Sequence, residues 1–188
     1  MSKNSSYSKQ NVADADIISL IEKDANQGFK LLLSSYQKPV YYHVRQMVYN
    51  HDDANDVTQN VFISVFRNIS KFKGESKLFT WIYRIATNES LNFLQQKARK
   101  NNIPYEDVAY EMSQNLEADV YYEGDEILIK LEQAIAKLPE KQRLVFQMKY
   151  FEELKYEEIS DILDTSVGAL KASYHHAVKK VEAFLLPD

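Results

Sequence analysis

Residues that can recognise nucleic acid recur at helical spacing in the middle of the chain. Arg84, Asn88 and Asn92 stand four apart, so they would line one stripe of an α-helix that begins near Lys77, and Arg99 extends the stripe. An asparagine amide both donates and accepts hydrogen bonds, which suits base edges, whereas Arg and Lys suit phosphates. A surface helix with incidental asparagines is the simpler alternative. The basic residues around the stripe favour nucleic-acid recognition.

Charge is divided unevenly along this chain, whose net charge is -4 at pH 7. Residues 71–100 carry seven Lys and Arg against two Glu, a net charge of +5. Residues 105–126 carry eight Asp and Glu with no Lys or Arg, a net charge of -8. Because cations that neutralise phosphates supply most non-specific DNA affinity, the basic block is expected to meet DNA and the acidic segment to repel it.

The fold class is expected to be all-α, with two small helical domains joined by an acidic linker. Apolar residues recur at spacings of three and four, as at Val57, Val61 and Val65, and the alternation typical of strands is absent. The acidic stretch follows Pro104 and lacks a sustained helical period. The predicted segments are a disordered tail at 1–12, a helical domain at 13–102, the linker at 103–126 and a second domain at 127–188.

The C-terminal region has the pattern of a helix-turn-helix, which places one helix in a DNA groove. Helices are expected at 140–150, after Pro139, and from about 155 to 163. Asp164 falls where the tight turn requires a left-handed residue, and Ser166 can cap the next helix. The predicted core face of that helix is Val167, Leu170, Tyr174, Val178, Val181 and Leu185. Its opposite face displays Lys171, Ala172, His175, His176 and Lys179.

Two sets of motifs occur in order along the chain. The first half contains DANDVTQNVF at 53–62 and FKGESKLFTWIYRIA at 72–86. The second half contains LPEKQR at 138–143, YFEEL at 150–154 and SVGALK at 166–171. They resemble regions 2 and 4 of the extracytoplasmic-function (group four) sigma factors of the sigma-70 family, over most of residues 14–185. The resemblance implies a protein that binds core RNA polymerase and directs promoter-specific transcription initiation.

The resemblance also implies three contact surfaces. The clamp coiled coil of core polymerase would be bound by Asp53, Asp56, Gln59 and Phe62, and region 4 would meet the flap. The -10 element would be contacted by Lys73, Lys77, Arg84, Asn88, Asn92, Lys97 and Arg99. The -35 element would be contacted by Ser166, Lys171, Ala172, His175, His176 and Lys179. Without the motif, Phe62 would be a core residue and Asp56 a solvated one.

Two details refine these expectations. The loop at 72–80 would trap a base flipped from the non-template strand, with Gly74 allowing close backbone approach, while Trp81 is expected in the core rather than as a stacking platform. The recognition helix carries Ala172, Ser173 and His176 where many relatives are rich in arginine. Its -35 contact is therefore expected either to be weaker or to depend more on DNA shape and on thymine methyl groups.

Catalysis, cofactors and metal binding find no support in the sequence. The chain has no cysteine, no Gly-rich phosphate loop and no His-Glu-x-x-His motif, and adjacent His175 and His176 diverge by about 100° on a helix. No segment is apolar enough to cross a membrane or to act as a signal peptide. We expect a cytoplasmic protein that is not an enzyme, needs no cofactor or metal, and does not insert into membranes.

The alternative is a stand-alone helix-turn-helix regulator whose N-terminal half is an interaction domain. The double match of the first half to polymerase docking and strand opening favours a sigma factor.

In the family, the linker threads through basic channels of polymerase, although a solvated tether would have the same composition. The resemblance to this family also allows an anti-sigma factor as a partner. Low overall basicity predicts that the free protein binds promoter DNA poorly and gains affinity when polymerase spaces the two domains.

Overall fold

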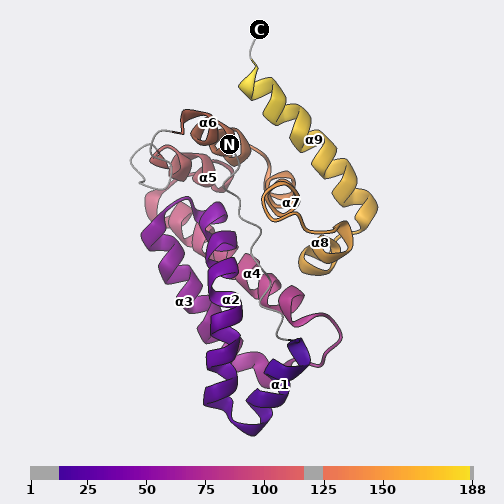
Figure 1. Cartoon of the computed structure of the whole chain (residues 1–188). Coiled ribbons are helices and arrows are strands. Elements are labelled where there is room, and N and C mark those ends of the chain that lie inside the picture. The colour runs from indigo at the N-terminus through magenta and orange to yellow at the C-terminus, as the bar shows by residue number, and fades with distance from the viewer. Residues whose placement is uncertain (1–12, 117–124, 187–188) are drawn as a thin grey trace.

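The computed structural model describes residues 13–116 and 125–186, and all regular structure in these ranges is helical (Figure 1). The helices are α1 (Asp14–Lys23), α2 (Ala25–Val48), α3 (His51–Asn68), α4 (Leu78–Asn101), α5 (Tyr105–Ser113), α6 (Glu126–Ala136), α7 (Glu140–Tyr150), α8 (Tyr156–Leu163) and α9 (Val167–Leu185), with a short 3-10 turn, η1 (Ile69–Lys71), after α3. The predicted all-α class is confirmed. The predicted tail at 1–12 lies outside the described residues.

The N-terminal half is a bundle of α1 to α4. The predicted apolar stripe is confirmed, since Val57, Val61 and Val65 of α3 are at most 2% exposed and pack with Val44 of α2 and Ile82 of α4. Burial of such side chains stabilises each by roughly 1.5–3 kcal/mol relative to exposure. The bundle thereby holds the outer faces of α3 and α4 in fixed orientations.

The side chain of Asp14 fixes the start of α4. One carboxylate oxygen accepts from the backbone N–H of Leu78 at 2.9 Å, and the other accepts from the Tyr36 hydroxyl at 2.8 Å. The Leu78 N–H is among those at a helix start that lack an intrahelical partner. Because the loop before α4 ends at this contact, α1 and α2 determine where that loop lies. Gly74 in the loop has a φ of 72°, a left-handed conformation that favours glycine.

The helix-turn-helix forms as the sequence predicts. The expected helix at 140–150 matches α7, and α8 begins at Tyr156, one residue later than expected. Asp164 ends α8 in the left-handed region, at φ 50° and ψ 49°. The Ser166 side chain accepts from the backbone N–H of Ala169 at 3.3 Å and so caps α9.

The predicted core face of α9 is confirmed in part. Leu170 and Val181 are buried, and Val167, Tyr174 and Val178 are half-buried. The prediction for Leu185 is wrong, since it lies in the last turn and is 37% exposed. Ala177 takes the remaining buried position, because a small side chain lets α9 approach its neighbours closely.

The acidic segment is more ordered than expected. The absence of a helical period was wrong for its first part, because α5 spans Tyr105–Ser113. Val108 and Ala109 are buried, as is Leu116 beyond the helix, and Met112 is half-buried. Positions 105, 108, 109, 112 and 116 follow the three-and-four spacing of an amphipathic helix, which the excess of carboxylates conceals. Residues 117–124 of the predicted linker lie outside the described residues.

Candidate nucleic-acid interface

The predicted stripe lies on the outer surface of α4. Arg84, Asn88, Asn92 and Arg99 are all exposed. Within residues 13–116 and 125–186, neither asparagine amide has a hydrogen-bond partner. Two unpaired amides, each both donor and acceptor, can therefore meet base edges without breaking an internal contact. Arg84 is already engaged, since its guanidinium donates to the backbone carbonyl of Asp161 in α8.

The expected cations do not all lie free beside the stripe. Lys73 is exposed in the loop before α4. Lys77 is exposed but pairs with Glu158 of α8, with Nζ and Oε1 3.1 Å apart. Lys97 is half-buried and pairs with Asp53 of α3, with Nζ and Oδ2 3.1 Å apart. This pairing turns Lys97 toward α3, so its charge is already compensated.

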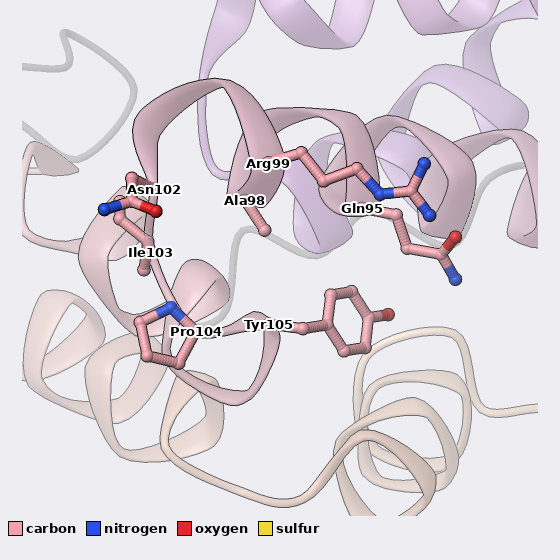
Figure 2. A pocket seen from close by; sticks show the side chains of 7 residues that line it. All are labelled: Gln95, Ala98, Arg99, Asn102, Ile103, Pro104 and Tyr105. Carbon is pink, nitrogen blue, oxygen red and sulfur yellow. The ribbon is translucent and has the colours of Figure 1, made fainter.

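A shallow cavity of about 400 Å³ lies at the C-terminal end of α4 (Figure 2). Its lining is Gln95, Ala98, Arg99, Asn102, Ile103, Pro104 and Tyr105. In Figure 2 the Gln95 amide and the Arg99 guanidinium extend along the same side of the helix, above the ring of Tyr105. Gln95 and Tyr105 are not among the contact residues predicted from the sequence. Gln95 stands three residues after Asn92 and is exposed, so helical spacing would have added it to the stripe.

The loop at 72–77 runs between η1 and α4. Its ring contact joins Phe72 to Trp81, whose centroids lie 5.4 Å apart. Both side chains pack partly buried against the core, which confirms the expectation for Trp81. Gly74 and Lys73 remain exposed at the tip of the loop. The loop is thus attached at both ends and open in its middle.

The outer face of α3 differs from expectation at its apolar residue. Asp56 and Gln59 are exposed and three residues apart, so they share one face. Phe62 is only 6% exposed and belongs to the core, so the expected surface anchor is not available there. Ile63 and Phe66 are instead 47% and 50% exposed. Consecutive residues on a helix point in different directions, so Phe62 can face the core while the next residue, Ile63, faces solvent.

The outer face of α9 carries the side chains that the sequence predicts there. Lys171, Ala172, His175, His176 and Lys179 are all exposed. Lys171 Nζ lies 5.7 Å from the centroid of the Tyr156 ring in α8. The hydroxyl oxygen of the exposed Ser166 accepts from the backbone at the start of the helix, and its O–H can still donate to another acceptor. The two histidine rings are 6.0 Å apart and tilted by 58°.

Ionisation of several tyrosines is suppressed. Burial raises the pKa of Tyr49, and the nearby charge of Glu132 adds to the effect. Burial likewise raises the pKa of Tyr105, whose hydroxyl donates to the Glu140 carboxylate. Both phenols are therefore neutral near pH 7 and act as hydrogen-bonding groups rather than charges.

None of the helices described is long and apolar enough to cross a bilayer. The described ranges contain no cluster of three potential metal ligands.

The α4 stripe and the helix-turn-helix both lie in parts of the chain that match known protein families. A family model for sigma-70 region 2 matches residues 32–100, and one for sigma-70 region 4 matches residues 128–181. The chain is 31% identical over 166 residues to the ECF RNA polymerase sigma factor SigW of Bacillus subtilis, covering 84% of this chain and 89% of the relative. The chain belongs to the ECF sigma factors of the sigma-70 family. Its α4 stripe lies within region 2, and its helix-turn-helix lies within region 4.

Other relatives of this sigma factor span nearly its full length. It is 29% identical over 184 residues to the RNA polymerase sigma-H factor of Pseudomonas aeruginosa, covering 93% of this chain and 94% of the relative. Its fold is similar to that of RpoE from Bartonella quintana, solved with the anti-sigma factor NepR, with a TM-score of 0.64 and 18% identity over 85% of this chain and 98% of that chain. It is also similar to CnrH, solved with the cytosolic domain of CnrY, with a TM-score of 0.66 and 17% identity over 93% of this chain and 97% of that chain.

Family membership establishes the biochemical class. This sigma factor binds core RNA polymerase and promoter DNA and directs promoter-specific transcription initiation. The alternative of a stand-alone helix-turn-helix regulator is not favoured, because region 2 is matched as well as region 4.

Proposed function

We propose that this sigma factor contacts the opened -10 strand with the stripe of α4 and the -35 element with the outer face of α9. The observation that carries the proposal is the pair Asn88 and Asn92, two exposed amides one helical turn apart that have no hydrogen-bond partner among the residues the structure describes. Unpaired bases are held by stacking and polar contacts, which such amides supply. The exposed loop around Gly74, next to the start of α4, is suited to take a flipped base, whose unstacking costs a few kcal/mol.

The cavity beyond the stripe extends this proposed surface. The Arg99 guanidinium can meet a phosphate, the Gln95 amide can meet a base edge, and the Tyr105 ring offers a flat apolar wall. The Glu140 carboxylate, which accepts from the Tyr105 hydroxyl, disfavours a phosphate at that end of the cavity. A bound strand would therefore place its backbone near Arg99 and a base nearer Tyr105.

The outer face of α3 is proposed to dock on the clamp coiled coil of core polymerase. Exposed Asp56 and Gln59 supply hydrogen bonds, and exposed Ile63 and Phe66 supply the apolar anchor that buried Phe62 cannot. Anchors surrounded by polar contacts are typical of interface centres. Asp53 fits a supporting role, because its pair with Lys97 joins α3 to α4. Region 4 is proposed to meet the polymerase flap.

The proposal also covers a further protein partner and the cellular location. Two solved relatives are complexes with other proteins, an anti-sigma factor in one case and the cytosolic domain of CnrY in the other. We expect a comparable anti-sigma partner for this chain, and a cytoplasmic location where core polymerase acts.

Reconstitution tests the proposed function. Core polymerase together with this protein should initiate at a limited set of promoters that core polymerase alone ignores. Sequencing the transcripts initiated after overexpression would supply those promoters, because their shared upstream elements reveal the specificity. Tight binding of the free protein to duplex DNA, without association with core polymerase, would contradict the proposal.

The phosphate role of Lys171 has its own test. Replacing Lys171 by alanine should weaken promoter binding by the holoenzyme. It should also make the slope of log K against log salt concentration less steep by about one, because one phosphate contact is lost. Lys30 lies exposed on α2, so Lys30→Ala is a matched control that should leave the salt dependence unchanged. Equal slopes for the two variants would reject a phosphate contact by Lys171.

A further inference from the structure

The loop at 72–77, which is proposed to take a flipped base, is attached to the bundle at its two ends. Phe72 packs on Trp81 at the first end, and the fully buried Leu78 begins α4 at the second. Within the part of the chain that the structure describes, residues 73–75 make no hydrogen bond. The shape of the space that a base would enter therefore depends on how the two ends are held.

The start of α4 lacks a local cap. The residue before the helix is Lys77, whose ammonium group can only donate and which makes no capping hydrogen bond. At this position Ser, Thr, Asp or Asn ordinarily supplies an oxygen that accepts from a free backbone N–H group of the first turn. The backbone N–H of Leu78 donates instead to Oδ2 of Asp14 at 2.9 Å, across 64 positions of sequence. Asp14 thus supplies the acceptor that the local sequence lacks.

A second hydrogen bond orients the Asp14 carboxylate. Its Oδ1 accepts from the hydroxyl of Tyr36 in α2 at 2.8 Å. Burial raises the pKa of Tyr36, and the hydrogen bond to Asp14 raises it further, so this phenol is neutral near pH 7 and donates. One carboxylate oxygen is therefore used by α2 and the other by α4. The half-buried side chain joins the two helices through contacts of defined length.

The helix that carries Asp14 is itself fixed on α2. Only Asp24 separates α1 from α2, and its side chain caps α2 by accepting from two backbone N–H groups at 3.0 Å each. Ile17 of α1 is fully buried, and the absence of a side chain at Gly28 lets the backbone of Ile21 approach α2 closely. In Figure 1, α1 lies at the lower end of the bundle, beside the loop that leads into α4. It is therefore a firm support for the end of that loop.

The supporting helix lies outside the segment that matches the family. The model for sigma-70 region 2 covers residues 32–100, which include Tyr36 and Leu78 but not α1. The residues proposed to contact the -10 element also lie within that segment. An element outside the matched region thus contacts the start of the helix that carries the proposed -10 surface.

Loss of the Asp14 contact should affect the loop more than the rest of α4. The buried face of α4, with Ile82, Ala86 and Leu94, holds the helix along its length without help from Asp14. The Leu78 N–H would lose its acceptor, however, and the first turn would be free to fray. Gly74, at φ of 72°, gives the loop little stiffness of its own. The end of the loop would therefore move while the middle of α4 stays in place.

We propose that Asp14 is a positioning residue for base capture, which caps α4 from α1 and so determines how well the loop at 72–77 holds the flipped base. The inference rests on the proposed function, because it requires that the loop takes a base. It deepens that function by giving α1 a part in reading the -10 element. Asp14 acts through the backbone of Leu78 and not by touching DNA.

The test measures how much the flipped base contributes to binding. Holoenzyme formed from core polymerase and this protein is titrated with a single-stranded oligonucleotide carrying the -10 element of a promoter that it uses. Each base is replaced in turn by an abasic site, and the loss of affinity is recorded as the penalty at that position. The flipped position is the one whose penalty falls in Gly74→Ala, which strains the loop without a clash because φ is positive and nothing lies within 4 Å of the new Cβ.

Asp14→Ala should reduce the penalty at the flipped position from about tenfold or more to about twofold, because a loosened loop gains little from the base. The penalties that depend on Asn88 and Asn92 should keep their wild-type values. Asp16→Ala is the matched control and should change no penalty. Asp16 also lies in the first turn of α1, is exposed, and makes no side-chain hydrogen bond among the described residues.

Two further variants separate positioning from a general loss of stability. Asp14→Asn should restore most of the penalty, because the amide oxygen can still accept from the Leu78 N–H. Tyr36→Phe keeps the ring and removes the hydroxyl that orients Asp14, so its penalty should lie between those of the wild type and Asp14→Ala. This variant also decides the matter if Asp14→Ala does not fold.

The possible results distinguish this inference from the proposed function. Equal penalties at the flipped position in Asp14→Ala and Asp16→Ala would overturn the positioning role. A fall of similar size at every position of the oligonucleotide would overturn it too, because a structural defect acts on all contacts alike. A wild-type holoenzyme that shows no penalty dependent on Gly74 would instead contradict base capture by the loop, which belongs to the proposed function.

Discussion

Replacing both Asn88 and Asn92 by alanine should lower the formation of open promoter complexes by about 30-fold or more. Each lost base contact costs roughly 1–3 kcal/mol, and the two residues lie one turn apart on the same surface of α4. Both side chains are exposed and lack internal partners among the described residues, so the substitutions leave the packing of the bundle intact. The loss should therefore fall on DNA contact and not on folding.

Three measurements separate this effect from others. Strand opening at the -10 element should fall, binding to core polymerase should remain, and the thermal midpoint of unfolding should shift little. Asn101→Ala, an exposed asparagine at the end of α4 on a different face, is the matched control and should retain near wild-type initiation. If the double variant instead loses core binding, these residues belong to the docking surface and the proposed contact with the strand is incorrect.

Replacing Gly28 by alanine should destabilise the protein by about 1–3 kcal/mol, although alanine normally favours a helix. Gly28 is buried in α2, and a Cβ there would lie 2.4 Å from the backbone nitrogen of Ile21 and 2.5 Å from its Cα. Backbone atoms cannot rotate aside, so α1 would have to move. Asp14 at the other end of α1 holds the start of α4, so displacement of α1 would also disturb the loop before α4.

Gly168→Ala is the matched control with the opposite expected sign. Gly168 lies in the first turn of α9, and nothing lies within 4 Å of a Cβ placed there. Alanine should therefore stabilise by up to about 1 kcal/mol through helix propensity alone. Urea unfolding followed by circular dichroism measures both changes. A Gly28→Ala variant as stable as the wild type would show that α1 does not pack this closely on α2.

Local signals predicted much of the fold and part of the interface. The three-and-four spacing of apolar residues predicted the helices, because the same periodicity determines which face of a helix is buried. The turn at Asp164 and the cap at Ser166 were predicted because their conformations depend on neighbouring backbone groups alone. The exposed faces of α4 and α9 followed from the same periodicity.

The structure differs from expectation where burial and pairing depend on residues distant in the sequence. Phe62 and Ile63 are neighbours of similar character, and only the position of the bundle determines that Phe62 is buried while Ile63 is 47% exposed. Lys97 was predicted to face DNA, but Asp53, 44 residues earlier, pairs with it. The helix α5 was missed because the excess of carboxylates conceals its three-and-four spacing, and its few apolar residues gain their stability from packing on other helices.

The sequence alone determined the family, the all-helical class, the helix-turn-helix and the exposed amides at Asn88 and Asn92. Each of these depends on residue types within a few helical turns of one another. Only the tertiary structure decided that the two halves close on each other through His43 and Glu152, which are 109 residues apart. That contact depends on the matching of two complete surfaces and on the removal of water from both, which no local spacing encodes.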